Sequence, residues 1–582
     1  MSIILVGLPV QQHTRRFHLE KGRRWNVVEH LVLQALTNRA WTAGELAIEG
    51  RLPRRVVLEA LIRLMRAGWV ELKAGVNEVK FHSTPRGLVV APEDELPGDV
   101  EPVAKKMNFA VDMVTGSIFR RRDLTLLWPQ EWRARTEGRR FVEIAAPTAP
   151  PRDLGHVSTL LGALLEEDER LVRVDISDRP PADRIAMFTV RNGEVEGLPP
   201  RNAPALRDVL LDAARQAPNV SEGPAAPIRV MGPEIPRLRP ERHTALRQED
   251  FILGGRAHQD HIDAALRRAK RHVIIHSTFL SREKFDLLVP ALRVAAARGC
   301  RIDILWGESK GESGFVKSLE EARAIDSSLD RAGLAGSVVV HLSSTRSHGK
   351  ILIADDGSGG IHATVGSCNW IYSGFDSFEA SVRLRDPLLV GDVLNEVAEL
   401  ARPRDGQIPE LTARLAQTAR ELAGKPPLSG NARVRLVIGE EHDDCLLQAR
   451  DQAARCITVL SHKLGVTAMP AVVIPAAAAV RDRQIAVELL YCIPSGPVEQ
   501  AKAAAARWQF EEQGVILRAV QRPRLHAKML LWDDDEALVT SLNWLSADTM
   551  NKNAHGEIGV RMFAPRAAER LREALRFAQM LA

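Results

Sequence analysis

The sequence has no long hydrophobic run. None of its apolar stretches approaches the roughly 18 residues from which a membrane-spanning helix is inferred. The opening MSIILVGLPV is apolar over a short stretch and has no basic segment before it, so it does not predict a signal peptide. We therefore expect a cytoplasmic protein that makes no stable association with a membrane.

Cysteine is also scarce, and its few positions are scattered. The chain has no CxxC pair and no cysteine at zinc-ligand spacing from a histidine, which argues against a disulfide framework and a structural zinc site. The pattern fits a reducing compartment, and we expect neither a metal nor another cofactor. The cysteines are Cys300, Cys368, Cys445, Cys456 and Cys492.

Net charge is small over the whole chain but uneven along it. The formal charge is +5, whereas residues 1–90 alone carry 14 Lys and Arg against 7 Asp and Glu. A basic segment on a near-neutral body favours a polyanionic partner. An ordinary solvated surface explains the same surplus equally well, so charge alone does not decide between them.

Residues 1–95 are predicted to form a winged helix-turn-helix domain. Apolar residues follow a helical spacing over 27–36, a short second helix comes next, and Pro53 begins a third helix that ends at Gly68. WVELKA and EVKFHS then alternate as two strands around a turn at Gly75. This order is typical of a winged helix, whose third helix enters a major groove of DNA.

Four basic residues are the candidate nucleic-acid contacts of this domain. Arg54 and Arg55 stand at the start of the third helix, and Lys73 and Lys80 lie on the two strands. The expected partner is nucleic acid, with DNA favoured. Such domains also serve in dimerisation or in docking to another protein, and the pattern fits that role too.

The remaining chain divides by composition and by an internal repeat. Strand-like and helical runs alternate in one region without any chemical motif, and a proline-rich stretch follows it. Beyond that stretch the order of helices and strands occurs twice. The predicted segments are an accessory α/β domain at 100–216, a linker at 217–244, a first repeat at 245–401, an inter-repeat linker at 402–433 and a second repeat at 434–582.

Each repeat contains an H-x-K-x4-D motif, followed by S-x-N-W and then a glutamate. One H-x-K-x4-D motif is a weak signal. Two motifs with the same followers, at the same place in two repeats, are very hard to obtain by chance. The residues are His348, Lys350, Asp355, Ser367, Asn369 and Glu379 in the first copy, and His526, Lys528, Asp533, Ser541, Asn543 and Glu557 in the second.

The spacing within each motif has a geometric meaning. Side chains alternate faces along a strand, so His348 and Lys350 point the same way, as do Ser367 and Asn369 on the following strand. We expect these four groups to bind phosphate on one face in each copy. Asp355 stands at an odd offset from the histidine, so it and Asp533 are predicted to face away and to hold the strand and loop. A pair of ordinary core histidines is the alternative, which two matching copies disfavour.

On these residues, 245–582 resembles the phospholipase D superfamily. The resemblance implies an α/β fold of two α/β/α sandwich repeats, related by a pseudo-twofold axis and sharing one active site. It also implies a metal-independent reaction through a phosphohistidine, with His348 as nucleophile and His526 as general acid. The lysines and asparagines would stabilise charge on the phosphate oxygens. Glu379 and Glu557 match the carboxylates that hydrogen-bond the other nitrogen of each histidine.

The basic amino-terminal domain makes a nuclease acting on DNA or RNA the favoured function. The alternatives are a phospholipase D or phosphatidyltransferase acting on phospholipid headgroups, and a nucleic-acid-binding regulator without catalysis. By analogy alone, such combinations of domains occur in bacterial restriction and phage defence, where a partner ATPase, helicase or other subunit is expected. The sequence does not distinguish single from double strands, or endonuclease from exonuclease action.

Overall fold

The computed structural model describes most of the chain, and its residue contacts divide it into two units. Unit 1 holds residues 1–155, 159–203 and 213–228, and unit 2 holds 156–158, 204–212 and 229–582. The described residues are 3–74, 79–93, 96–146, 157–166, 168–175, 180–198, 204–218, 239–308, 314–403, 407–465, 468, 472–495, 503, 507–508, 510–546 and 556–581.

Unit 1 contains a small helical module whose elements follow the predicted order. They are α1 (Val27–Asn38), α2 (Ala43–Glu49), α3 (Arg54–Arg66), β2 (Val70–Ala74), β3 (Val79–Ser83) and α4 (Pro85–Val90). Asn26 and Thr42 begin the first two helices with capping boxes, in which the side chain and backbone of each bond a glutamate three residues on. The predicted turn at Gly75 lies outside the described residues.

The long strand β1 (Ile3–Arg23) belongs to a different sheet from that module. It pairs antiparallel with β4 (Asp99–Asp112), β8 (Glu169–Asp175) and β9 (Ala182–Arg191), and parallel with β7 (Phe141–Glu143). Residues 3–23 are therefore part of the accessory sheet, and a single domain at 1–95 is wrong in this respect. The sequence hid the strand because its second half, QQHTRRFHLEKGR, buries few side chains besides Phe17 and Leu19.

The accessory sheet has eight strands, with β1 at its centre. Its main path runs β10-β9-β1-β4-β5, while β6 pairs with β9 and β7 and β8 pair with β1. The sheet therefore collects strands from both ends of unit 1. The further elements between residues 113 and 216 are β5 (Ile118–Arg120), β6 (Leu126–Leu127), α5 (Pro129–Thr136), α6 (Val157–Leu164), β10 (Glu194–Glu196) and α7 (Pro204–Arg215), and residues 204–212 of α7 belong to unit 2.

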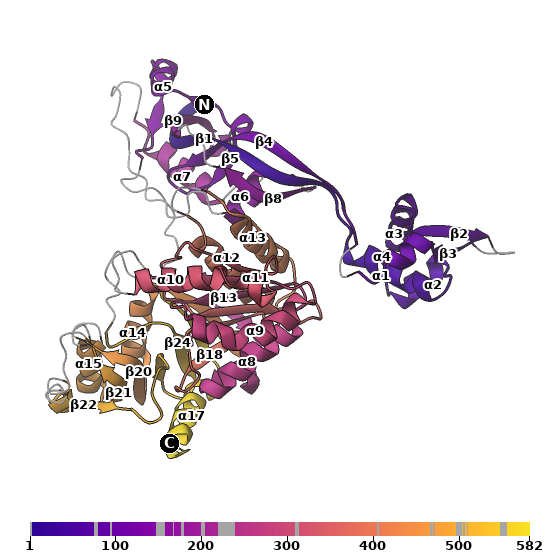
Figure 1. Ribbon diagram of the computed structural model, residues 1–582. Helices are drawn as coiled ribbons and strands as arrows, with labels where there is room; N and C mark the ends of the chain where they lie inside the picture. The colour runs from indigo at the N-terminus through magenta and orange to yellow at the C-terminus, as the bar shows by residue number, and fades with distance from the viewer. Residues whose placement is uncertain are drawn as a thin grey trace. The chain divides into compact units, whose positions relative to one another are not determined.

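Unit 2 begins with the first repeat, a mixed sheet of seven strands covered by helices (Figure 1). The order is β12-β18-β17-β16-β13-β14-β15, with β13, β14 and β15 parallel and the other pairs antiparallel. The elements are β12 (Phe251–Leu253), α8 (Gly255–Arg268), β13 (His272–Ser277), α9 (Arg282–Ala296), β14 (Arg301–Trp306), α10 (Phe315–Asp326), α11 (Leu329–Ala332), β15 (Val338–Val340), β16 (Ile351–Asp355), β17 (Ile361–Gly366), β18 (Ala380–Leu384) and α12 (Pro387–Leu400).

The second repeat has the same connections, which confirms the predicted α/β fold of two repeats. Its sheet runs β11-β19-β25-β24-β23-β20-β21-β22, again with three parallel strands at one side. The elements are β19 (Ala432–Ile438), α14 (Glu441–Gln452), β20 (Cys456–Leu464), α15 (Ile474–Arg483), β21 (Ala486–Pro494), β22 (Val515–Ala519), β23 (Met529–Trp532), β24 (Glu536–Thr540), β25 (Ile558–Phe563) and α17 (Ala567–Leu581).

Both predicted linkers contain ordered structure at one point. The end of the 217–244 linker forms β11 (Arg242–Thr244), which pairs with β19, while 219–238 lie outside the described residues. The 402–433 linker holds α13 (Glu410–Ala423), which packs on α12. Its sequence LTARLAQTARELA has apolar residues at helical spacing, and they are buried, so the segment is a packed helix and not only a connection.

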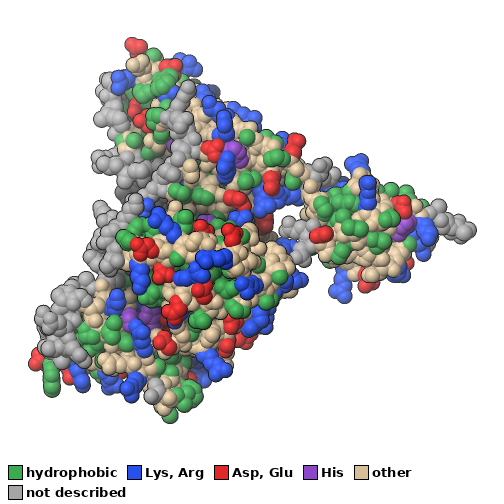
Figure 2. Space-filling model, in the orientation of Figure 1, with side chains coloured by type: hydrophobic (Ala, Val, Ile, Leu, Met, Phe, Trp, Pro, Cys, Tyr) green, Lys and Arg blue, Asp and Glu red, His purple; other side chains and the backbone are tan. Residues whose placement is uncertain are grey.

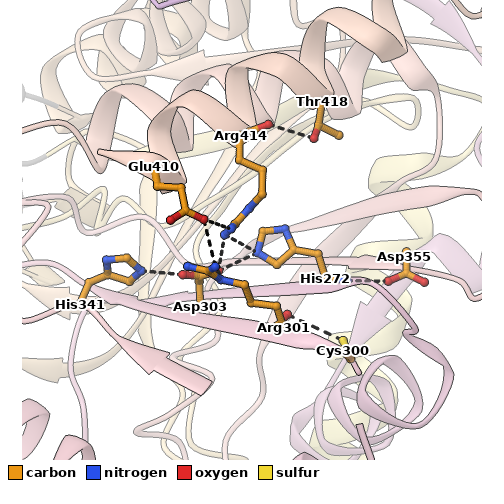
Figure 3. A network of polar contacts seen from close by, with 9 residues as sticks. All are labelled: His272, Cys300, Arg301, Asp303, His341, Asp355, Glu410, Arg414 and Thr418. Atoms are coloured by element: carbon orange, nitrogen blue, oxygen red, sulfur yellow. Dashed lines mark hydrogen bonds and ion pairs between the residues drawn. The ribbon is translucent and has the colours of Figure 1, made fainter. Parts of the chain in front are cut away.

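A buried network of charges joins α13 to the first repeat (Figure 3). Asp303 on β14 has a fully buried side chain, and it accepts from His272 and His341 at 2.8 Å each and from Arg414 at 2.6 Å. Burial alone would raise the pKa of Asp303, but hydrogen bonds from the two histidines and the charge of Arg414 hold it far below its usual range. Asp303 is therefore ionised and ties the inter-repeat helix to the sheet.

No described helix is both long and apolar enough to cross a membrane. This holds for the helices of both units as far as the chain is described.

Replacing Asp303 tests this network. We expect Asp303→Asn to lower the free energy of unfolding by about 3–5 kcal/mol at pH 7, because it leaves Arg414 without its buried carboxylate. Since the folded-state pKa is lowered, the stabilisation is present above the unfolded pKa of about 4 and is lost as pH falls below it. Chemical denaturation at pH 7 and below pH 4 measures both effects.

Asp330→Asn is the matched control, because Asp330 is an exposed carboxylate on α11 of the same repeat. It should change stability by less than about 0.5 kcal/mol. A difference between Asp303→Asn and wild type that stays constant below pH 4 would contradict an ionised Asp303.

Candidate active site

The motif residues of the first copy lie at one edge of the sheet. His348 and Lys350 come immediately before β16, and Ser367 and Asn369 come immediately after β17, so they flank the strands on which they were predicted. Because β16 and β17 are antiparallel, the start of one strand lies beside the end of the other. Residues 348–350 and 367–369 thus lie close together, although both segments lie just outside the paired residues of the two strands.

The second copy repeats this arrangement, and the two edges face one cavity of about 350 Å³. β23 pairs with β24 antiparallel, with Met529 opposite Val539, which places His526 and Lys528 beside Ser541 and Asn543. The two motifs therefore form one composite site. The lining includes His348, Lys350, Asn369, Glu379, His526, Lys528, Ser541 and Asn543.

Each histidine is held by the glutamate of the other repeat. His348 Nδ1 lies 3.1 Å from Glu557 Oε1, and His526 Nδ1 lies 2.7 Å from Glu379 Oε1. An ionised carboxylate can only accept, so Nδ1 carries the proton in both pairs. This arrangement fixes the tautomer and leaves Nε2 of each ring as the nitrogen that the carboxylate does not engage.

The two glutamates remain ionised despite full burial. Burial alone would raise the pKa of Glu379, but the charge and hydrogen bond of His526 together with Lys528 hold it at about 2. Burial acts in the same direction on Glu557, and His348 and Lys350 likewise hold its pKa at about 2. Both carboxylates can therefore stabilise a positive charge on their histidines near neutral pH.

The two lysines are buried, and their pKa values are lowered. Burial lowers the pKa of Lys528 to about 7, with the charge of Glu379 opposing this and that of Lys350 adding to it. Burial also lowers the pKa of Lys350, against the charges of Glu557 and Glu379. Lys350 Nζ donates to Thr278 Oγ1 at 2.8 Å, which holds it in the cavity. Two neighbouring cations that repel each other favour an anion between them.

The two serines hold the carboxylates. Ser367 Oγ donates to Glu379, and Ser541 Oγ donates to Glu557. Both serine side chains are buried, and each hydroxyl also accepts a backbone N–H at 3.0 Å. Ser541 also lines the cavity, and phosphate binding by the two serines stays a prediction.

The motif aspartates bind backbone and are absent from the cavity lining. Asp355 accepts from the backbone N–H groups of Arg271 and His272 at 2.9 and 3.0 Å, at the start of β13. Asp533 accepts from the N–H groups of Ala454 and Arg455 at 2.8 and 2.7 Å, before β20. Each aspartate thus fastens the end of its motif strand to the neighbouring strand.

Several lining residues were missed from the sequence. His462 is a buried residue near the end of β20, at the place that Thr278 takes in the first copy, and its ring lies 4.7 Å from that of His526. Burial lowers the pKa of His462 to about 3, with His526 adding to the effect, so its ring is neutral. The alignment of HSTFLS with LSHKLG could have pointed to it. The other missed lining residues are Thr278, Phe279, Tyr372, Ser373, Gly374, Asp376, Ser377, Lys463 and Arg524.

The candidate nucleic-acid contacts belong to unit 1, whereas the candidate active site belongs to unit 2. Arg54 and Arg55 are exposed at the start of α3. Lys73 on β2 is directly opposite Lys80 on β3 in the hairpin. Like charges placed opposite each other on a hairpin repel each other, so this face of the hairpin is suited to binding an anion.

Among the described residues, no group of three or more His, Cys, Asp or Glu could hold a metal ion. The candidate site is instead defined by histidines, lysines and carboxylates at the edges of two sheets.

Comparison with known proteins supports the family resemblance. Residues 262–401 match the family model described as "Cardiolipin synthase, PLD-like domain", and no curated protein matches the chain. The chain is also similar to solved structures of Haemophilus influenzae phosphatidylserine synthase (14% identity, TM-score 0.41, 58% of this chain and 88% of that one) and a yeast tyrosyl-DNA phosphodiesterase mutant (12%, 0.35, 51% and 83%). A third is NucT from Helicobacter pylori (14%, 0.19, 26% and 94%).

The matched segment covers the first motif, and the second repeat has the same motif beside the corresponding strands, β23 and β24. Residues 262–401 therefore match a PLD-like domain, and the motif residues of both repeats line one cavity.

Proposed function

We propose that the chain is a metal-independent phosphodiesterase that cleaves nucleic acid through a phosphohistidine intermediate. The observation that carries this proposal is the pair of histidines in one cavity, each held through Nδ1 by a buried carboxylate. Two such histidines suit a reaction that needs a nucleophile and a proton donor on the same phosphorus.

In the first step His348 Nε2 attacks phosphorus, and the bond from phosphorus to the leaving oxygen breaks. His526 gives its Nε2 proton to that oxygen, and Lys350 and Lys528 stabilise charge on the other phosphate oxygens. In the second step His526 takes a proton from water, the water oxygen attacks phosphorus, and the bond to His348 breaks. Burial lowers the pKa of His526, with Glu379 opposing, so an anionic substrate promotes its protonation.

The remaining lining supports a nucleic-acid substrate. Tyr372 is 44% exposed, and its ring lies 5.4 Å from that of Phe279, so an aromatic surface is available for a base to stack on. Lys463 and Arg524 line the same cavity and can contact neighbouring phosphates. A phospholipid headgroup would use the phosphate-binding centre but has no need of a stacking surface, so it is the second choice.

The helical module of unit 1 supports nucleic-acid binding through α3. Its exposed face carries Arg54, Arg55 and Arg66, and the two opposed lysines lie on the hairpin that follows. The module also exposes apolar side chains, with Ile48 80% exposed and Val89 71% exposed, and Figure 2 shows hydrophobic atoms on its surface. These favour protein docking as a second role, in keeping with a partner subunit. A place in restriction or phage defence stays a prediction.

Chelation tests the proposed chemistry. We expect labelled DNA or RNA to be cleaved in EDTA, because lysines and histidines take the part that cations play in other phosphodiesterases, and vanadate should inhibit. Release of labelled fragments is measured beside release of headgroups from phospholipid vesicles. A variant with both His348→Ala and His526→Ala serves as the control and should lose at least about 10³-fold in rate.

Strict dependence on magnesium would contradict a histidine-based site. Headgroup release without nucleic-acid cleavage would favour the lipid alternative, and binding without any turnover would favour the regulator.

The cross-repeat pairing predicts how single variants group. Loss of the general acid spares substrates whose leaving group departs without a proton, such as a nitrophenyl phosphodiester, whereas loss of the nucleophile spares none. We expect His526→Ala and Glu379→Gln to keep much more activity on the activated diester than on an unactivated dinucleotide. His348→Ala and Glu557→Gln should lose about 10²–10⁴-fold on both. The ratio of the two rates is the measurement.

Asp376→Asn is the matched control, since Asp376 is an exposed carboxylate that lines the same cavity. It should leave the ratio unchanged. If His526 were the nucleophile and His348 the general acid, the two groups of variants would exchange their behaviour. Each histidine variant would still group with the variant of its paired glutamate. If Glu379→Gln grouped with His348→Ala, the functional pairing across repeats would be wrong.

The α3 contacts are tested by Arg54→Ala with Arg55→Ala. Each arginine that pairs with a phosphate releases about 0.9 counterion, so we expect weaker DNA affinity and a salt slope reduced by about 2. Turnover of a nitrophenyl phosphodiester should be unchanged. Arg86→Ala, an exposed arginine on α4, is the control. Unchanged affinity and slope in the double variant would favour protein docking over DNA binding.

A further inference from the structure

The first repeat contains a second cavity, of about 390 Å³, which shares no lining residue with the candidate active site. It is formed by α8, the turn between β16 and β17, the end of β18 and the residues at the end of α13. Its size lies in the range of pockets that bind small molecules, about 300–1,000 Å³.

Positive charge dominates this cavity. Four cations line it, Arg268, Arg383, Arg385 and Lys425, against the single carboxylate Asp356. That carboxylate is already engaged within its own turn, where it accepts from Ser358 N at 2.8 Å and from Gly360 N at 3.0 Å. The cavity therefore offers cations without an equal number of available anions.

Two of the arginines are held in place from behind. Asp250 has a fully buried side chain and accepts from Arg383 Nε at 3.0 Å and from Arg385 at 2.6 Å. In the part of the chain that the structure describes, the buried Nε of Arg385 has no hydrogen-bond partner. A guanidinium fixed on one side loses little entropy when it binds an anion on the other.

Two histidines complete the polar lining. Burial lowers the pKa of His261 to about 3 and that of His362 to about 4, with nearby cations adding to both effects. Both rings are therefore neutral near pH 7 and can donate as well as accept hydrogen bonds. His261 Nε2 lies 2.8 Å from Thr364 Oγ1, which orients the ring.

The second repeat serves as an internal comparison because the strand registers match. His362 lies opposite Ala354 in the first copy, and Glu536 lies opposite Trp532 at the same place in the second. Arg383 of the first copy corresponds in register to Arg561 of the second.

In the second repeat a tryptophan ring occupies the corresponding place, and the charge of the arginine there is balanced by a glutamate. Arg561 pairs with Glu536 at 3.3 Å and lies 5.2 Å from the centre of the Trp532 ring. The first repeat has a neutral histidine in place of the glutamate and a small Ala354 in place of the tryptophan. An open cationic cavity is therefore a property of the first repeat and not a by-product of the shared fold.

We infer that this cavity binds a small organic phosphate of about the size of a mononucleotide, at a site separate from the candidate catalytic residues. Arginines pair with phosphate oxygens through two parallel hydrogen bonds, and the neutral histidines add donors without extra charge. The phosphate could belong to a free nucleotide or to the phosphorylated end of a strand, and the test separates these sources.

The test is calorimetric titration of the full chain with AMP, with inorganic phosphate and with an oligonucleotide phosphorylated at its 5′ end. We expect two classes of AMP site in the wild type. His362→Glu installs the residue found in the second repeat, and Lys425→Glu reverses an exposed charge at the rim. Each variant should weaken AMP binding at least tenfold at one of the two classes of site. Turnover of a nitrophenyl phosphodiester should stay within about twofold of wild type.

Lys317→Glu on α10 makes the same charge reversal outside both cavities and should keep both classes. Affinities for AMP and for the 5′-phosphorylated oligonucleotide that are both unchanged in His362→Glu and Lys425→Glu would overturn the inference. A single class of site that only His526→Ala removes would overturn it too. Loss in these variants of oligonucleotide binding but not of AMP binding would contradict a free nucleotide and support the strand end. Lys425→Glu keeps the test decisive if His362→Glu does not fold.

Discussion

The candidate site depends on two hydrogen bonds that cross between the repeats, from His348 to Glu557 and from His526 to Glu379. These pairs join residues 209 and 147 positions apart, and each repeat depends on the other for the carboxylate that holds its histidine. Each glutamate is in turn held by a serine of its own copy. The consequence is a single centre in which both rings have a fixed tautomer and Nε2 is the nitrogen that the carboxylate does not engage. A change in how the repeats pack would therefore act on both histidines at once.

The same pairs decide the electrostatics of the cavity. Two buried lysines would be costly without compensation, and Glu379 and Glu557 supply it while staying ionised. The compensation is incomplete, since burial lowers the pKa of Lys528 to about 7 even with Glu379 beside it. An anionic group bound between them would bring the missing negative charge and favour the protonated forms of the lysines and of His526 together. Under the proposed mechanism, substrate binding and protonation of the general acid are therefore linked through one set of charges.

The sequence was sufficient for features that depend on local order. The repeated motif predicted the two α/β repeats, and Asp355, predicted to hold the strand and loop, accepts from backbone N–H groups at the start of β13. The motif could not predict which glutamate meets which histidine, because strand periodicity carries no information about contacts between repeats. Ser367 shows the same limit, since its spacing does not identify Glu379 as its partner. The strand β1 was missed because the second half of this strand is partly solvated and its pattern is weak. The helix α13 has a clear helical spacing of apolar residues and was missed because it lies between the repeats in a segment interpreted as a linker.

The differences between the repeats are as informative as their similarity. The fold needs the same strands, the same aspartate anchors and the same glutamate–serine pairs in both copies, and these are kept. Elsewhere the copies diverge in chemistry at matching places: Thr278 against His462 beside the lysines, and His362 against Glu536 beside an arginine. At each matching place, both of the alternative residues pack well in their own sheet. The duplicated fold by itself therefore does not require the two copies to differ there. Differences of this kind at the cavity lining are what specialisation of two half-sites for one asymmetric substrate would produce, with an aromatic surface contributed by the first repeat and Lys463 and Arg524 by the second.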